Sequence, residues 1–343
     1  MEDERLVIHI GPISSKGGMS GVMKLLIANP PVNYKVGHLD TYIDSSTLIK
    51  ILNLFRIRRK LIMDIKSLKP NVFHFHVTHN FSWWRNLFLV RIALKFKIPC
   101  IINIHSGKFD IFCKKFNSIP GRIFRRLSKN KLIQFVVLED RWIESLQIYA
   151  NNLVCIRNPI DLKELSDRNE IEREDISLLL IARNDKIKGH DFAVEVLRLI
   201  NEGGFEARLE MTGVKKNFNI PHDLNVTTHE WIHDFEEVRR KIKNSDFALS
   251  PSEYEGSSMS VLEAMSLGTI PIVSKVSSET VSVKELVVDN MNPEDWAKAI
   301  IKIVSKGQQR DLREKIKKTI KRHEVNHISN QWKDQYNMII ESN

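Results

Sequence analysis

Short apolar runs alternate with helix-length segments along most of this chain, and that alternation limits the fold more than any other feature. Strands joined through helices run parallel, because a helical crossover returns the chain to the same end of the sheet. The sequence therefore predicts an α/β fold with helices on both faces of a parallel sheet. The first series comprises the strand-like runs Leu6–Ile10, Val72–Val77, Cys100–Ile104, Phe135–Leu138 and Leu153–Ile156, with the helical patterns Trp83–Phe96 and Asp140–Tyr149.

The alternation stops at Asn158-Pro159-Ile160-Asp161 and the charged stretch Lys163–Asp175, and then resumes. We interpret this break as a linker between two α/β domains, residues 1–160 and 161–326, followed by a C-terminal helix within residues 327–343. The second series comprises Ile176–Ala182, Asp191–Asn201, Arg208–Thr212, Asp246–Ser250, Ile270–Ser274, Asn292–Ser305 and Gln308–His323, and the last helix covers Ile328–Ile340.

Charge is unevenly distributed between the two halves. The chain carries a net charge of +10, with 25 Lys and Arg against 10 Asp and Glu in residues 1–160. Such asymmetry predicts an anionic partner for the first domain. The segment Lys108–Lys131 mixes basic and aromatic side chains, which is typical of a surface that rests on lipid headgroups, although an ordinary solvated basic face is the alternative. That mixture consists of Phe109, Phe112, Phe116, Phe124, Lys114, Lys115, Arg122, Arg125, Arg126 and Lys129.

Neither the cysteines nor the hydropathy predict export or membrane insertion. Cys100, Cys113 and Cys155 are isolated and show no metal-ligand spacing. No apolar run approaches the roughly 18–20 residues of a membrane-spanning helix, and the first residues lack the layout of a signal peptide. We therefore expect a cytoplasmic protein that is peripheral on the inner face of the plasma membrane.

The most informative local pattern lies between Ser250 and Pro271. A short strand ends at Ser250, a polar loop carries Glu255-Gly256, and a helix is expected from about Ser258 to Leu267. Such a strand–loop–helix unit points unpaired backbone N–H groups at the space above the strand end, which attracts phosphate. Glu255 and Glu263 could hold sugar or ribose hydroxyls beside it, whereas Glu263 could instead close a capping box with Ser260.

A second pattern, Ala182-Arg183-Asn-Asp-Lys-Ile-Lys188-Gly189-His-Asp191, directly follows a strand. An Arg at the strand end and a Lys at the start of the next helix offer a guanidinium fork and a point charge, which suit a diphosphate. Near the N-terminus, Gly17 and Gly18 come before a helix, where glycines let the backbone approach a ligand closely. This loop is not the Gly-x-Gly-x-x-Gly of dinucleotide enzymes, which argues against NAD.

Histidines form a third group. His105 follows the buried strand Cys100–Ile104, and it suits either a ligand contact or a structural role. His74, His76 and His79 raise the possibility of a metal site, since the first two share one face of a strand. No carboxylate or cysteine accompanies them, so we predict no metal.

Together these motifs resemble the retaining glycosyltransferases of family 4, which have the GT-B fold of two Rossmann-like domains facing a cleft. The resemblance also implies that the C-terminal helix 327–343 crosses back and packs on the first domain. The resemblance is strong over Ile176–Ser274 and loose before it. It implies that Arg183 and Lys188 neutralise a departing nucleotide diphosphate, and that Glu255 contacts the donor sugar. It further implies that Glu263 holds the ribose, that His105 lies near the sugar, and that donor phosphates face Gly17, Gly18 and the backbone of Gly256, Ser257, Ser258 and Met259.

The resemblance implies a reaction as well as a site. We expect transfer of a hexose or N-acetylhexosamine from a nucleotide sugar, most simply a UDP-sugar, to a lipid-linked saccharide in O-antigen or capsule synthesis, without cofactor or metal. The alternatives are a sugar-nucleotide epimerase of the same fold and a non-catalytic nucleotide-sugar-binding scaffold. The basic half also permits RNA binding, but no RNA-recognition motif accompanies it, so we expect no nucleic acid partner.

Overall fold

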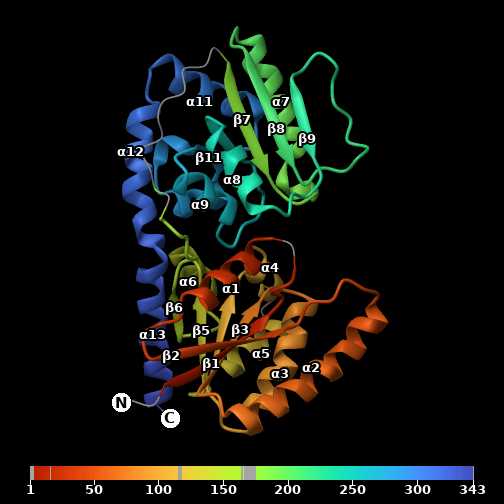
Figure 1. Ribbon diagram of the computed structural model, residues 1–343, viewed down its shortest axis with the longest axis vertical. Helices are drawn as coiled ribbons and strands as arrows, with labels where there is room; N and C mark the ends of the chain where they lie inside the picture. The colour runs from red at the N-terminus through yellow and green to blue at the C-terminus, as the bar shows by residue number, and fades with distance from the viewer. Residues whose placement is uncertain (1–3, 16, 115–117, 164, 166–174, 343) are drawn as a thin grey trace. The chain divides into compact units, whose positions relative to one another are not determined.

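The computed structural model describes residues 4–15, 17–114, 118–163, 165 and 175–342, and it separates into two compact units. The first unit combines Met1–Pro159 with His323–Asn343, and the second is Ile160–Arg322. The stretch Lys163–Asp175 that we interpreted as a linker lies almost entirely outside the described residues. Each unit is described below by itself (Figure 1).

Within the described residues, the first unit is built on a parallel six-stranded sheet in the order β2-β1-β3-β4-β5-β6. This confirms the predicted α/β class. The strands are β1 Arg5–Gly11, β2 Tyr34–Asp40, β3 Val72–Val77, β4 Cys100–Ile104, β5 Ile133–Val137 and β6 Leu153–Cys155. The helices are α1 Gly18–Ala28, α2 Thr47–Leu68, α3 Phe81–Lys95, α4 Phe109–Cys113, α5 Ile119–Leu127, α6 Asp140–Leu146 and α13 Val325–Glu341.

The strand β3, Val-Phe-His-Phe-His-Val, divides the first sheet into an apolar and a polar face. Successive side chains of a strand point to opposite faces, so Phe73 and Phe75 share one face while His74 and His76 share the other. Both phenylalanines are fully buried in the main hydrophobic cluster, which also includes Ile57 and Leu61 of α2. The apolar face therefore packs under α2, α3 and α5.

The C-terminal helix α13 covers the histidine-bearing face. Trp332 lies with its ring centroid 4.3 Å from that of His74, and the Tyr336 hydroxyl is 2.8 Å from His74 Nδ1. Both side chains are almost fully buried. Because these residues come from the far end of the sequence, the first unit is complete only when residues 323–343 are in place.

The second unit also contains, among its described residues, a parallel six-stranded sheet, in the order β12-β11-β10-β7-β8-β9. The strands are β7 Ile176–Ile181, β8 Ala207–Thr212, β9 Val226–His229, β10 Phe247–Ser250, β11 Ile270–Ser274 and β12 Val287–Val288. The helices are α7 His190–Glu202, α8 Phe235–Lys243, α9 Met259–Ser266, α10 Ser278–Val281, α11 Pro293–Ser305 and α12 Gln309–Ile320. Short 3-10 turns cover Lys186–Lys188, Lys275–Ser277, Lys284–Leu286 and, at the unit boundary, Lys321–His323.

Helices lie on both faces of this second sheet. One group joins α7 to α11, and the other joins α9 to α8, α10 and α12 (Figure 1). A buried cluster of Leu179, Ile242, Ala264 and Leu267 connects the centre of the sheet to α8 and α9. The loops that leave the carboxyl ends of β7 and β10 are thereby held between packed helices.

Several elements were not predicted from the sequence, among them the short helices α4, α5, α8 and α10 and the two-residue strand β12. The edge strands β2 and β9 and the 22-residue helix α2 were absent from the predicted series, since their patterns are weak. α2 buries the large apolar residues Ile57, Leu61 and Ile65 but exposes twice as many, so its apolar stripe is poorly defined. The exposed ones are Ile49, Ile51, Leu52, Phe55, Met63 and Leu68. None of the described helices is long and apolar enough to cross a membrane.

Candidate functional site

In the second unit, the candidate site lies where the strand order reverses. β7 has β8 on one side and β10 on the other, although β10 is separated from it by two strands in sequence. The loops after β7 and β10 therefore leave the sheet on opposite sides of this point. In open α/β sheets, ligands bind in the crevice outside the carboxyl ends of the strands at such a switch point.

Two predicted site residues meet here. Lys188 Nζ lies 2.5 Å from Glu255 Oε1, and the side chains are only 16% and 14% exposed. The cation comes from the 3-10 turn after β7 and the carboxylate from the loop after β10. A charge pair so shielded from solvent interacts more strongly than a surface pair, so each side chain restricts the other.

The backbone fixes the two loops against each other. The N–H of Glu253 donates to the carbonyl of Ile187 at 3.0 Å. Gly189 has φ 73°, and a Cβ there would lie 2.8 Å from Pro251 Cγ. Only glycine fits such a conformation without strain, so Gly189 allows the turn that presents Lys188 to pack directly on the loop that presents Glu255.

Arg183 has a different environment from Lys188. It follows β7 and its side chain is exposed. The backbone beside it is tightly packed, because a Cβ on Gly213, which has φ 77°, would lie 1.9 Å from the carbonyl oxygen of Ala182. The structure therefore holds the backbone of Arg183 while leaving its guanidinium accessible.

The helix α9 begins directly after the site loop. Its N-cap is Ser258, whose side chain forms no capping hydrogen bond, and Ser257, Ser258 and Met259 are all largely buried. Glu263 lies in the second turn of α9. The capping-box interpretation of Ser260 and Glu263 is therefore wrong, because the helix starts too early for Ser260 to be its cap.

Part of the Glu263 residue is exposed to solvent, but its carboxyl group is shielded from water. Burial raises the pKa of this carboxyl to about 7, with no neighbouring cation among the described residues to offset the effect. Such a group changes charge in the neutral range, which is unusual for a glutamate and typical of functional sites.

In the first unit, the glycine loop leads into α1. Gly17 is the N-cap of this helix with φ 116°, a conformation that disfavours any other residue, and Gly18 is its first residue. The loop follows β1, which lies between β2 and β3, so it also leaves the sheet where the strand order reverses.

His105 directly follows β4, and its ring is joined to other buried histidines. His105 Nε2 lies 2.9 Å from His76 Nδ1, and His76 Nε2 lies 2.9 Å from His9 Nδ1. The grouping of His74, His76 and His79 proposed from the sequence is wrong, since His79 turns to Ser106 Oγ at 2.6 Å. His9 takes its place, and ring nitrogens of His9, His74 and His76 lie within 4.8 Å of one another.

The aromatic part of the segment Lys108–Lys131 does not form a surface. Phe109 and Phe124 are fully buried, with Phe124 packed on Phe135 at 4.5 Å between ring centroids. Phe112 packs partly against the same core, while Lys115 and Phe116 lie outside the described residues. Helical periodicity turns these phenylalanines inward, so the expectation that they rest on lipid is wrong for those that the structure describes.

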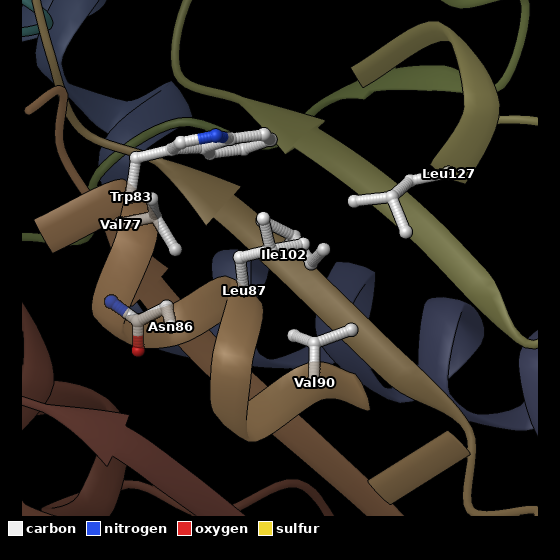
Figure 2. Close-up of a pocket in the computed structure, with 7 residues that line it drawn as sticks. All are labelled: Val77, Trp83, Asn86, Leu87, Val90, Ile102 and Leu127. Carbon is white, nitrogen blue, oxygen red and sulfur yellow. The ribbon is translucent and has the colours of Figure 1, made fainter. Parts of the chain in front are cut away.

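A small apolar pocket lies in the core of the first unit, between α3, β3, β4 and α5 (Figure 2). Its volume of about 10 Å³ is no more than one water molecule needs. It is a packing defect rather than a substrate site. Figure 2 shows the lining side chains, namely Val77, Trp83, Asn86, Leu87, Val90, Ile102 and Leu127.

Sequence reasoning thus named both members of the Lys188–Glu255 pair, but it missed their supports. Gly189 had appeared in a motif, whereas Gly213 had no signal, because its role depends on a neighbouring strand end. The contact of His105 with His76, and through it with His9 and Tyr336, was also missed. The shared face of His74 and His76 was the only available indication of that cluster.

Most of the second unit matches the model of a known protein family. Residues 175–306 match the family model described as "Glycosyl transferases group 1". The second unit is therefore similar to this family over most of its length. The matched residues are less than half of the chain, but they include Arg183, Lys188, Glu255 and Glu263. The prediction of a transferase enzyme is confirmed by this match and by the relatives below.

Two curated relatives are similar to this chain over stretches longer than residues 175–306. An "Uncharacterized 41.2 kDa protein in cps region" of Klebsiella pneumoniae is 26% identical over 293 residues, covering 79% of this chain and 81% of the relative. A "GDP-mannose-dependent alpha-(1-6)-phosphatidylinositol dimannoside mannosyltransferase" of Mycobacterium tuberculosis is 25% identical over 181 residues. That match covers 48% of this chain and 46% of the relative.

Solved structures share the whole architecture. Sucrose-phosphate synthase from Thermosynechococcus elongatus superimposes with a TM-score of 0.76 at 15% identity, covering 99% of this chain and 100% of that one. The E. coli trehalose-6-phosphate structure bound with UDP-2-fluoro glucose gives 0.70 at 10% identity, covering 97% and 98%. At these identities the likeness establishes the fold, and the predicted GT-B class is confirmed.

The buried histidines make the stability of the first unit depend on pH. Burial lowers the pKa of His9 to about 3 and those of His74 and His76 well below their usual value of 6.5. Below pH 6.5 the unfolded chain binds protons that the folded chain cannot. We expect each of these histidines to lower the free energy of unfolding by about 1.4 kcal/mol between pH 7.5 and 5.5.

Urea unfolding at the two pH values measures this loss. His74→Phe should reduce the pH dependence, while His327→Gln, which replaces an exposed histidine of α13, should leave it unchanged. An equal stability of the wild-type protein at pH 7.5 and 5.5 would contradict the assignment of these histidines as neutral.

Proposed function

We propose that this protein is a retaining glycosyltransferase that moves a hexose or N-acetylhexosamine from a nucleotide sugar to a lipid-linked saccharide. One observation carries the proposal: Lys188 and Glu255 form a shielded ion pair at the switch point between β7 and β10, within the residues that match the group 1 glycosyltransferase family. A diphosphate needs cations and a sugar needs hydrogen-bond acceptors. This place in the fold offers both.

The chemistry follows from these side chains. Arg183 and Lys188 would stabilise the negative charge that develops on the leaving diphosphate, together with backbone N–H groups at the start of α9. Glu255 would orient the sugar and stabilise positive charge at its anomeric carbon. Two protein cations supply the positive charge for the leaving group, so the proposal includes no metal or cofactor.

The remaining predicted residues have supporting roles in this proposal. Glu263 would accept hydrogen bonds from the ribose, and His105 would contact a sugar hydroxyl. Gly17 and Gly18 would let the loop before α1 approach donor phosphates. No second carboxylate stands out as a nucleophile, which favours front-face transfer without a covalent intermediate.

The relatives support a setting in surface polysaccharide synthesis. One lies in a cps region, and another is named as a mannosyltransferase that acts on a phosphatidylinositol dimannoside. We propose capsule or O-antigen assembly with a UDP-sugar donor. Because the second relative is named as GDP-mannose-dependent, the donor screen should include GDP-mannose alongside UDP-sugars.

A mass-spectrometric screen of sugar nucleotides against lipid-diphosphate acceptors tests this proposal. An α-linked donor should give an α-linked product, which the anomeric coupling constant measures by NMR. A β product would contradict retention. Isomerisation or hydrolysis of the donor that does not require the acceptor would identify an epimerase instead. Binding of the nucleotide sugar without turnover would identify a scaffold.

Substitution of the two cations tests leaving-group stabilisation. Arg183→Ala and Lys188→Ala should each lower kcat roughly 10²–10³-fold, the usual effect of removing a group that stabilises developing charge. Lys186→Ala is the matched control, because Lys186 is exposed in the same turn. Near-normal turnover in both variants at unchanged melting temperature would eliminate this role.

Glu263 gives a second test through pH. Its carboxyl, with a pKa of about 7, is charged above that pH and accepts hydroxyl hydrogen bonds best in that form. UDP binding should therefore weaken by up to about tenfold per unit as the pH falls below 7. Calorimetry on the wild type and on Glu263→Gln separates this effect from titration of UDP itself. Identical pH profiles in the two proteins would exclude the assigned role.

Because the described phenylalanines of the segment Lys108–Lys131 turn inward, membrane association would have to use another surface of the first unit. The exposed side of α2 combines Leu52 and Phe55, each 60% exposed, with Arg56 and Arg59. Apolar side chains among cations suit the headgroup region of anionic lipid, where each basic residue contributes about 1 kcal/mol. We propose that the protein is peripheral on the cytoplasmic membrane face through α2.

Liposome sedimentation measures this binding. Leu52→Ser with Phe55→Ser should lower binding to anionic liposomes, and added salt should weaken the binding of the wild type. Arg56→Ser with Arg59→Ser should lower it as well, and Arg122→Ser with Arg126→Ser, on α5, provides the charge-matched comparison outside α2. Absence of binding of the wild-type protein to anionic liposomes at low salt would refute the membrane proposal.

A further inference from the structure

Five side chains on the covered face of the first sheet form one continuous series of hydrogen-bonding groups, here called the imidazole chain. Its contacts measure 2.9 Å, 2.9 Å, 3.4 Å and 2.8 Å in order from His105. The members, in that order, are His105, His76, His9, Tyr336 and His74. They come from β4, β3, β1 and α13, so neighbouring strands and the C-terminal helix build the chain together.

Every ring in the imidazole chain is neutral at physiological pH. Burial lowers the pKa of His9 and of His105 to about 3, and the pKa values of His74 and His76 also lie well below 6.5. A neutral imidazole has one N–H donor and one acceptor nitrogen. Each ring that bonds on both sides must therefore donate in one direction and accept from the other, so the bonds among His105, His76 and His9 point the same way.

The far end of the chain determines which way they point. His74 Nε2 is buried and has no partner among the described residues. Trp332 packs on this ring at 4.3 Å, and its indole N–H, which can only donate, is equally without a partner in the described structure. A proton on His74 Nε2 would add a second buried donor without an acceptor, which is costly. The proton therefore belongs on Nδ1, facing the Tyr336 hydroxyl.

That choice sets the rest of the series. His74 donates to the Tyr336 oxygen. The hydroxyl hydrogen of Tyr336 has no acceptor other than His9 Nε2 left among the described residues, so it points there. His9 Nδ1–H then donates to His76 Nε2, and His76 Nδ1–H donates to His105 Nε2.

We propose that the imidazole chain is a positioning device for His105. It occupies Nε2 of that ring as an acceptor and so keeps the ring proton on Nδ1. His105 is half-exposed, and no described side chain bonds to Nδ1. His105 therefore presents a neutral N–H donor in a fixed orientation.

A donor of this kind selects for an oxygen with free lone pairs. Sugar hydroxyl, acetamido carbonyl and phosphoryl oxygens all qualify, whereas an ammonium or another N–H group does not. Any contact of His105 with a sugar rests on the proposed function. The tautomer itself does not, because it follows from the buried contacts alone.

The geometry favours hydrogen bonds over a metal at this cluster. The rings of His74 and His76 are stacked, with planes 11° apart and centroids 4.4 Å apart. Imidazole lone pairs lie in the ring plane, so stacked rings do not point them at one shared ion. The 2.9 Å contact between His9 and His76 also occupies one nitrogen of each ring.

Long-range ¹H–¹⁵N NMR on the full chain, labelled at histidine, reads the tautomers directly at pH 7 without substrate. His105, His76 and His9 should each show a protonated Nδ1 and an unprotonated Nε2. A proton on Nε2 of His105 would overturn the proposal, as would zinc added in slight excess shifting the resonances of His9, His74 and His76 together.

Variants test whether the chain acts on His105. His76→Phe keeps an aromatic ring but removes the donor, so the tautomer ratio of His105 should change about 3- to 10-fold, the effect of one ordinary hydrogen bond. His74→Phe is the matched control on the same strand. The Tyr336 hydroxyl can then donate only to His9, so the direction is kept and His105 should keep its proton on Nδ1. An unchanged His105 in His76→Phe contradicts the proposal. If that variant does not fold, the wild-type spectrum still decides.

Since these spectra need no substrate, they also separate the two proposals. Correct tautomers in a protein that transfers no sugar would refute the transferase proposal alone. Active protein with His105 protonated at Nε2 would refute the imidazole chain alone.

Discussion

The parallel pairing of β7 with β10 is the constraint on which the candidate site depends. These strands are separated in sequence by β8 and β9, yet they lie side by side in the sheet. Their carboxyl ends therefore open at the same edge, with one loop leading to each side. Without that pairing, Lys188 and Glu255 would be 67 residues apart with no reason to meet, and their 2.5 Å contact would not exist.

A second constraint acts in the first unit, where desolvation and hydrogen bonding oppose each other. Burying several imidazoles is unfavourable unless their polar atoms find partners. β3 places two of them on one face, β1 and β4 add one each, and Tyr336 of α13 joins the series. The same burial that keeps these rings neutral makes each of them both a donor and an acceptor. A polar cluster in the core thus specifies which helix can cover it.

Much of the fold could be predicted from the sequence because the strong signals are local. The central strands β1, β3, β4, β7, β10 and β11 are short, apolar and bounded by turns, and the helix after Glu255 was expected within a residue or so of α9. The edge strands β2 and β9 were missed because an edge strand carries a weaker pattern. The long helix α2 was missed because its exposed apolar residues disrupt the helical periodicity.

The candidate site, like the fold, could be predicted from the sequence only in part. Arg183, Lys188, Glu255 and Glu263 could be named because each follows a recognisable strand–loop–helix pattern. Their environments could not, since burial of the Glu263 carboxyl and exposure of Arg183 depend on packing from other elements. The phenylalanines of the segment Lys108–Lys131 show the opposite error. Their composition indicated a surface, while helical phase placed Phe109 and Phe124 in the core.

The position of α13 also affects how this protein is made. The second unit is continuous from Ile160 to Arg322, so all of its residues emerge from the ribosome before the last helix does. The first unit is translated earlier but lacks Trp332 and Tyr336 until residues 323–343 have been added. One face of its sheet therefore stays uncovered by α13 while the second unit is being synthesised. The order of completion on the ribosome is therefore the reverse of the order along the chain.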